Sequence, residues 1–111
     1  MATWKTVCEI ASALDVAEES TSYRKPCFKV RGKWMLGMSP HEEGALVVRV
    51  DPDERELLLA SDPDLYYVTP HYAGWHTLLL VRLDKIRKRA LRERIEDSYD
   101  LTVMSLATRR R

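Results

Sequence analysis

The chain has 111 residues, 45% of them hydrophobic, and its formal net charge is +1. This length and composition are typical of one compact domain that buries its own core, so we expect a single domain over residues 1–111. No apolar run reaches the roughly 20 residues that span a bilayer, and the N-terminus lacks the basic and apolar regions of a signal peptide. These features argue against a secreted or membrane-spanning protein, and we expect a cytoplasmic one with no membrane partner.

The first predicted element is a helix from Thr3 to about Leu14. Thr3 is a suitable N-cap, and the apolar residues after it recur at spacings of three and four, which places them on one helix face. These residues are Trp4, Val7, Cys8, Ala11 and Leu14. An extended segment is predicted next, near residues 19–23.

A hairpin follows, with strands over residues 27–30 and 33–38 joined across Arg31 and Gly32. Pro26 suits a strand start. Phe28 and Val30 alternate with cations, and a period of two puts the apolar side chains toward a core and the cations toward water. The hairpin is therefore predicted to carry a row of positive charge on one face.

The middle of the chain alternates between strands and turns. After a turn over residues 39–44, residues 45–50 are almost entirely apolar, which is typical of a central strand. Asp51 as cap and Pro52 at the first position predict a helix to about Ala60. A short strand over 66–68, a loop over 69–74 and a strand over 75–83 complete this part.

The last predicted element is a long helix that Asp84 caps. Its apolar stripe recurs in steps of three and four, and Ile86 does not join it, so either the first turn is irregular or Ile86 packs elsewhere. We expect the basic tail, about residues 108–111, to fray. The stripe consists of Leu91, Ile95, Tyr99, Thr102 and Leu106.

The elements run helix, three or four strands, helix, two strands, helix. Tight turns join the strands, which favours antiparallel pairing. The sequence therefore predicts an α+β fold: a two-layer sandwich with an antiparallel sheet and helices packed on one face.

Positive charge is concentrated in two segments. Residues 20–41 hold five cations and no acid, and residues 82–111 hold ten cations and five acids. Such residues can neutralise phosphates and release counterions, and no helix-turn-helix, zinc-finger or RNP-type pattern for reading bases is present. The candidate nucleic-acid-binding residues are Arg24, Lys25, Lys29, Arg31, Lys33, Lys85, Lys88, Arg89 and Arg92.

Two interpretations of these charges stay open. If the basic hairpin and the basic C-terminal helix meet in space, they form a basic pole that binds double-stranded DNA with little sequence preference. Alternatively, the cations belong to ordinary solvated strand and helix faces. The two interpretations differ in the position of the hairpin relative to the helix.

A second group of candidate residues is His71, Tyr72 and Trp75, followed by His76. These residues could line a small pocket with Trp75 as its floor, while the plainer interpretation makes Trp75 part of the core and leaves the histidines exposed. Two histidines five residues apart, with no accompanying cysteine or carboxylate, do not match a metal-ligand pattern. We expect no metal and no cofactor.

Sequence motifs for catalysis are missing. The chain has no Gly-x-Ser-x-Gly, no glycine-rich phosphate loop and no His-Glu-x-x-His. The acidic residues near positions 51–54 and 62–64 suit helix caps and turns. We therefore expect no catalytic residues and a non-enzymatic protein.

The two cysteines, Cys8 and Cys27, both lie in apolar patterns, as buried thiols of a reducing compartment do. A disulfide between them is the less favoured alternative. If Phe28 and Val30 point inward, Cys27 points outward with Lys25 and Lys29, whose charges would lower its pKa and make it reactive.

Several short segments, in this order and spacing, resemble the MmcQ/YjbR-like family of small bacterial proteins. The segments are Ala13-Leu14, Glu18-Glu19-Ser20, residues 25–33, Thr69-Pro70-His71-Tyr72, Trp75 and Ser98-Tyr99-Asp100-Leu101. Cys27 departs from the family, in which a small residue such as alanine is usual there.

The resemblance implies a helix, an antiparallel sheet and further helices, a fold similar to that of CyaY and of secretion chaperones. Members are commonly labelled DNA-binding, and the resemblance implies that function only weakly, because fold alone does not determine function. Our leading hypothesis is DNA binding through the basic hairpin and helix. The alternative is a protein–protein interaction module, chaperone-like or self-associating, with no nucleic-acid role.

Overall fold

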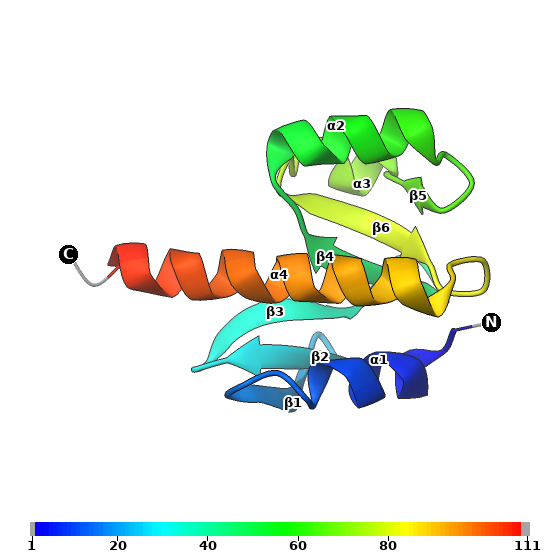
Figure 1. Cartoon of the computed structure of the whole chain (residues 1–111). Helices are drawn as coiled ribbons and strands as arrows, with labels where there is room; N and C mark the ends of the chain where they lie inside the picture. The colour runs from blue at the N-terminus through cyan, green and yellow to red at the C-terminus, as the bar shows by residue number, and fades with distance from the viewer. Residues whose placement is uncertain (1, 110–111) are drawn as a thin grey trace.

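The computed structural model describes residues 2–109, which form an α+β fold of six strands and four helices (Figure 1). The helices are α1 (Trp4–Ala11), α2 (Pro52–Ser61), α3 (Pro70–Ala73) and α4 (Lys88–Arg109). The strands are β1 (Ala17–Ser22), β2 (Lys25–Val30), β3 (Lys33–Met38), β4 (Ala45–Arg49), β5 (Tyr66–Tyr67) and β6 (Leu78–Arg82). The predicted antiparallel α+β architecture is confirmed.

All neighbouring strands pair antiparallel, in the order β1-β2-β3-β4-β6-β5. Two-residue turns join the first three strands. Both central residues of each turn have positive φ, namely Tyr23 and Arg24 at 52° and 66° and Arg31 and Gly32 at 50° and 82°. This is the type I′ pattern, whose twist matches that of the flanking strands. The predicted hairpin across Arg31 and Gly32 is therefore present.

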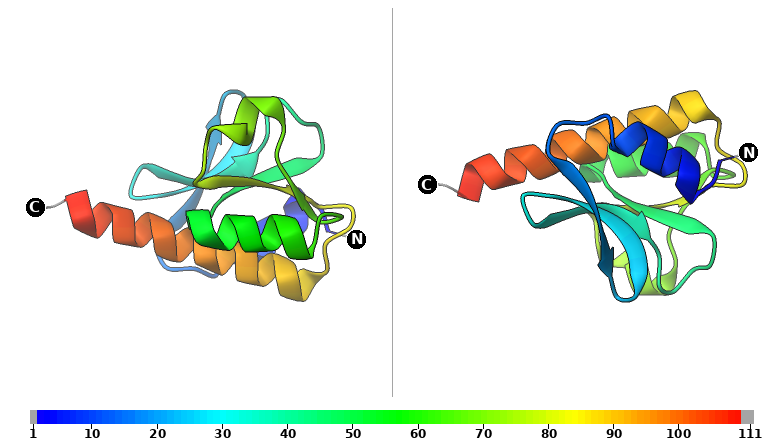
Figure 2. Two further views of the ribbon diagram at one scale, coloured as in Figure 1. Left: turned by 90° about the horizontal axis from the view of Figure 1, so that it is seen from above. Right: turned by 90° about the horizontal axis from the view of Figure 1, so that it is seen from below.

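The sheet has a covered inner face and a more open outer face. Helices α1, α2 and α4 lie on the inner side, whereas the four-residue α3 lies on the outer side, next to the β1–β2 turn (Figure 2). Alternation along β4 assigns Leu46 and Val48 to the large inner core, and Ala45 and Val47 to a small outer cluster. The period of two that the sequence predicts thus separates a core from a candidate binding surface.

The first helix is shorter than predicted and ends at Ala11. Ala13 and Leu14 donate backbone hydrogen bonds to Ile10 and Ala11 in tight turns. The chain thereby reverses into β1, which begins at Ala17. Leu14 still packs against the inner core.

The prediction that Asp84 caps the last helix is wrong, because α4 begins at Lys88. The amides of Lys85 and Ile86 both donate to the carbonyl of Arg82, which forms a turn in place of a first helical turn. This turn directs Ile86, only 2% exposed, into the inner core. An irregular start therefore explains why Ile86 lies outside the helical stripe.

Three further boundaries differ from the prediction. The loop over 69–74 contains α3, and the strand expected from Trp75 is only Leu78–Arg82. At the C-terminus, α4 continues to Arg109, so helix covers the first two residues of the predicted frayed tail. Residues 110–111 of that tail lie outside the described residues.

Val16 has a strained backbone, with φ of 55° and a side chain that is 41% exposed. A β-branched residue in the left-handed region is unfavourable, whereas glycine adopts it freely. We expect Val16→Gly to raise the free energy of unfolding by about 1 kcal/mol, measured by urea denaturation. Val16→Ala retains a Cβ, so its free energy of unfolding should rise by less than that of Val16→Gly. Equal loss of stability in both variants would contradict this account.

Candidate functional site

A groove with a volume of about 610 Å³ lies on the outer face of the sheet. It is bounded by the β1–β2 turn, the loop after β3 and the segment around α3. Its lining includes six aromatic or imidazole side chains and, among the described residues, no aspartate or glutamate. The ring-bearing residues are Tyr23, Trp34, His41, His71, Tyr72 and Trp75.

The structure brings the predicted pocket residues His71, Tyr72 and Trp75 together in this groove. Backbone hydrogen bonds from Tyr72 to Thr69 and from Trp75 to Tyr72 close the tight turns around α3. Tyr72 is 5% exposed and packs against the outer face of β4 and β6, whereas Trp75 is 58% exposed. Tyr72, and not Trp75 as expected, therefore forms the floor.

Ser39 connects two walls of the groove. Its Oγ lies 2.7 Å from the Tyr72 hydroxyl and accepts hydrogen bonds from the amides of His41 and Glu42. His41 in turn lies against His71, with ring centroids 3.9 Å apart. These contacts hold the loop after β3 against α3.

Arg55, a buried cation on α2, holds the other end of α3. Its guanidinium donates to the carbonyl oxygens of Tyr72 and Ala73 at 3.3 and 3.4 Å, and lies 3.3 Å from Nδ1 of His76. Cationic groups stabilise the exposed carbonyls at a helix C-terminus. Arg55 thus positions the segment that carries Tyr72 and Trp75.

The groove also contains a paired cation and indole. The Arg49 guanidinium lies 5.6 Å from the Trp34 ring centroid, and its Nε donates to the Trp34 carbonyl oxygen at 2.9 Å. Burial lowers the pKa of Arg49 from its ordinary value. Sequence reasoning did not single out Trp34, Arg49, Ser39 or His41. Alternation along β4 assigns Arg49 to the outer face and was the available signal for it. Trp34 had no such signal, because Met35 and Leu36 both enter the inner core and the register shifts beside them.

The five hairpin cations divide between two ends of the sheet. Arg24 and Lys25 follow Tyr23 at the groove, and Lys29 shares the outer face with Cys27 and pairs with Trp34 in the register. Glu18 lies opposite Lys29 in that register. These three cations, Arg24, Lys25 and Lys29, are here called the groove cations.

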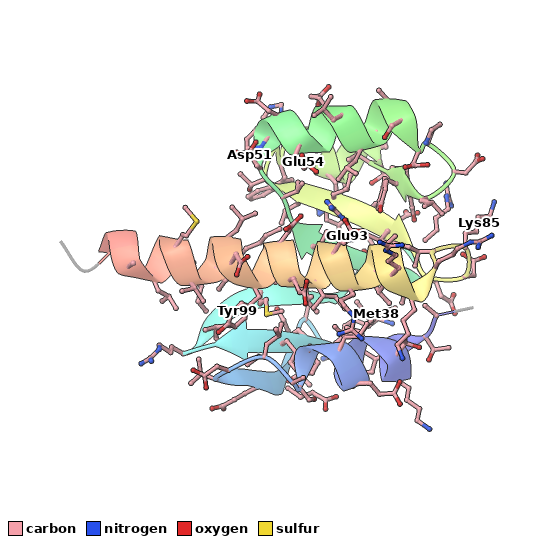
Figure 3. All side chains as sticks on the ribbon, in the orientation of Figure 1. Met38, Asp51, Glu54, Lys85, Glu93 and Tyr99 are labelled. Carbon is pink, nitrogen blue, oxygen red and sulfur yellow. The ribbon has the colours of Figure 1, made fainter. Side chains whose placement is uncertain are left out.

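Arg31 and Lys33 lie at the β2–β3 turn, away from the groove. The Lys33 ammonium contacts the Ser105 hydroxyl, near the C-terminal end of α4. The helix cations Lys85, Lys88, Arg89 and Arg92 are exposed and lie in or just before the first turns of α4. Lys85 is seen at that end of the helix in Figure 3. At 1.5 Å per residue, Lys88 and Ser105 are about 25 Å apart along the axis. The hairpin therefore meets the C-terminal half of α4 and not the cations that precede it.

Arg94, also in the basic part of α4, is buried and serves the fold. Its guanidinium forms ion pairs with Asp97 at 3.1 Å and with Glu54 of α2 at 3.8 Å. These contacts join α4 to α2 on the inner side. Not every cation of this segment is thus available to a partner.

Cys27 lies on the outer face as expected, but it is only 1% exposed. Burial raises the pKa of the Cys27 thiol, and the charge of Lys29, which acts in the opposite direction, has the smaller effect. The hypothesis of a reactive thiol with a lowered pKa is therefore wrong. Burial and Glu19 likewise raise the pKa of Cys8, and both cysteines are free.

We expect iodoacetamide to label Cys27 much more slowly at pH 7.5 than a small free thiol, because the thiolate is the nucleophile. A raised pKa moves thiolate formation to more alkaline pH than for a free thiol, so labelling should accelerate only as the solution becomes alkaline. Mass spectrometry of intact protein and peptides measures both rates, and urea should abolish the protection. Rapid labelling at neutral pH in the folded state would contradict this expectation.

The described residues, 2–109, contain no helix that is long and apolar enough to cross a membrane. Within the same part of the chain, no cluster of three or more His, Cys, Asp or Glu side chains could hold a metal ion.

Comparison with known proteins identifies relatives over most of the chain. The YjbR family model matches residues 12–101. Uncharacterized proteins of Mycobacterium bovis and of two Mycobacterium tuberculosis strains are 29% identical, over 89% of this chain and 87% of theirs.

A solved structure has the same fold. The crystal structure of Deinococcus radiodurans protein DR2400, which contains the family-model domain DUF419, superposes with a TM-score of 0.77. The match covers 91% of this chain and 78% of that one, at 21% sequence identity. The resemblance that the short segments indicated is confirmed: the chain belongs to the YjbR family.

Proposed function

We propose that this protein is a non-enzymatic DNA-binding protein whose groove cations bind phosphates with little sequence preference. The observation that carries the proposal is the charge of the outer face. Arg24, Lys25 and Lys29 are neighbours, in sequence or strand register, of the lining residues Tyr23, Ser22 and Trp34. The groove contains Arg49 and two imidazoles and, in the described part of the chain, is lined by no carboxylate. An anionic polymer can therefore approach the groove itself, although Glu18 lies opposite Lys29 and Glu42 and Glu43 lie on the loop after β3.

The helix cations take a different part in this proposal. They surround the start of α4 on the inner, helix-covered side of the sheet, so they attract DNA at long range without adjoining the groove. With a net charge of only +1, binding should be weak and strongly dependent on salt.

The test is fluorescence anisotropy of a labelled random-sequence duplex at two salt concentrations. Replacing Arg24, Lys25 and Lys29 with serine should weaken binding at low salt by about tenfold. It should also lower the salt slope by nearly one unit for each lost phosphate contact. The matched control replaces Lys85, Lys88 and Arg92 with serine, which removes the same charge from the start of α4 and the turn before it.

If the two triple variants lose the same duplex affinity, only net charge matters, and a site on the outer face is contradicted. No binding by the wild-type protein at low salt would contradict DNA binding altogether.

A protein partner is the second candidate, and the position of β1 favours it. Within the described residues β1 pairs only with β2, so its other edge can accept a strand from another chain. Light scattering after size-exclusion chromatography tests self-association. A dimer that does not bind the duplex would favour this second function.

A further inference from the structure

We propose that the groove accepts an unstacked nucleobase, so that the preferred nucleic acid is single-stranded. This inference rests on the proposed function, because it uses the groove cations as the phosphate contacts. It adds a role for the aromatic side chains, which duplex binding leaves unused.

The first argument is the exposure of large aromatic side chains at the groove. Tyr23 is 85% exposed and Trp75 is 58% exposed, and they come from segments about fifty residues apart. Both neighbour a half-buried Trp34 and the buried Tyr72 floor in one cavity. Aromatic faces that remain open to solvent are the surfaces on which single-stranded nucleic acids stack their bases.

The second argument is the combination of shape and charge. Phosphates need cations, and bases need a flat apolar surface with a few polar groups. The groove cations adjoin lining residues, since Arg24 and Lys25 follow Tyr23 and Lys29 pairs with Trp34. Ser22, Thr77 and the two imidazoles are polar groups within the cavity. A purely apolar partner would leave this positive border unused.

The third argument concerns the duplex. Paired bases are stacked inside the double helix and must be turned out, at a cost in free energy, before they can enter a concave site. A single strand avoids this cost. The cavity of about 610 Å³ falls within the size range of small-molecule sites, which is suitable for a base.

The experiment compares three labelled probes of equal length by anisotropy: an unstructured single strand, its duplex, and an abasic strand that retains the phosphates. The single strand should bind at least tenfold more tightly than the other two. Trp75→Ala should lower the affinity for the single strand about tenfold and leave the affinity for the duplex unchanged. Leu57→Ala on α2, where the side chain is 66% exposed, is the matched control and should leave both affinities unchanged.

A second variant, Tyr23→Asn, tolerates the positive φ at this turn and should also weaken single-strand binding. Circular dichroism checks that each variant is folded. Quenching of tryptophan fluorescence by the single strand should fall in Trp75→Phe, which gives a readout independent of affinity.

The outcomes separate the two proposals. If single and abasic strands bind equally, and the serine triple variant of the groove cations weakens both, the base site is wrong and the DNA-binding proposal stands. If Trp75→Ala and Leu57→Ala behave alike, the base site is also wrong. If no probe binds, the proposed function fails and this inference fails with it.

Discussion

Replacing Ser98 with alanine should lower the free energy of unfolding by about 2–4 kcal/mol, because it leaves two buried backbone groups without a partner. Ser98 is fully buried on α4. Its hydroxyl donates to the carbonyl oxygen of Met35 at 2.8 Å and accepts from the amide of Arg49 at 2.9 Å. One side chain thus joins α4 to both β3 and β4.

The need for this bridge follows from the sheet. The register shifts beside Phe28, and the pairs between β3 and β4 run only from Leu36 with Val48 to Met38 with Leu46. Met35 and Arg49 lie just beyond the last pair, where the ladder would otherwise continue. The Ser98 hydroxyl occupies that position and satisfies both groups.

Urea denaturation followed by circular dichroism measures the change. The matched control is Thr102→Val, which removes a buried hydroxyl that donates only to the Ser98 carbonyl within the same helix. It leaves no buried backbone group unpaired and should cost less than 1 kcal/mol. A Ser98→Ala cost no greater than that of Thr102→Val would contradict the bridging role.

Gly37→Ala should be the second large effect, with a loss of about 1–3 kcal/mol from overpacking. Gly37 pairs with Cys27 across β2 and β3. A Cβ at position 37 would lie 2.7 Å from the Cys27 Cβ and 3.1 Å from the Pro26 carbonyl oxygen. Since paired Cβ atoms normally lie about 4.5–5.5 Å apart, the two strands would have to separate.

A double-mutant cycle with Cys27→Gly identifies the cause. Cys27→Gly removes the nearer atom, so the double variant should lose about 1 kcal/mol less than the sum of the single changes. Cys27→Ala retains its Cβ and should not rescue Gly37→Ala. Strictly additive effects would show that the contact between these two residues is not responsible.

Local signals in the sequence were sufficient for the elements whose ends are chemically marked. Asp51 accepts hydrogen bonds from the amides of Asp53 and Glu54, as its position before Pro52 predicted. The type I′ turn at Arg31 and Gly32 was recognisable because glycine tolerates positive φ. The turn at Tyr23 and Arg24 has no glycine and carried no comparable signal.

The candidate site was only partly readable from the sequence. His71, Tyr72 and Trp75 were recognised as a cluster, but the assignment of floor and rim depended on the outer face of β4 and β6. Arg55 could not be recognised as a clamp for α3, because its partners lie 17 and 18 residues away in the chain. From its position in the predicted helix alone, Arg55 looks the same as a solvent-exposed arginine.

The sequence by itself determined most of the helices and strands and the alternation of apolar and charged residues along β2 and β4, because these depend on neighbours within a few residues. It also indicated the family, through short segments in a fixed order. Only the tertiary structure decided which charges share a surface. Register and the path of α4 bring Lys33 to Ser105 and the groove cations to the aromatic cavity. These distances arise from strand pairing and helix packing between distant segments, which no local pattern encodes.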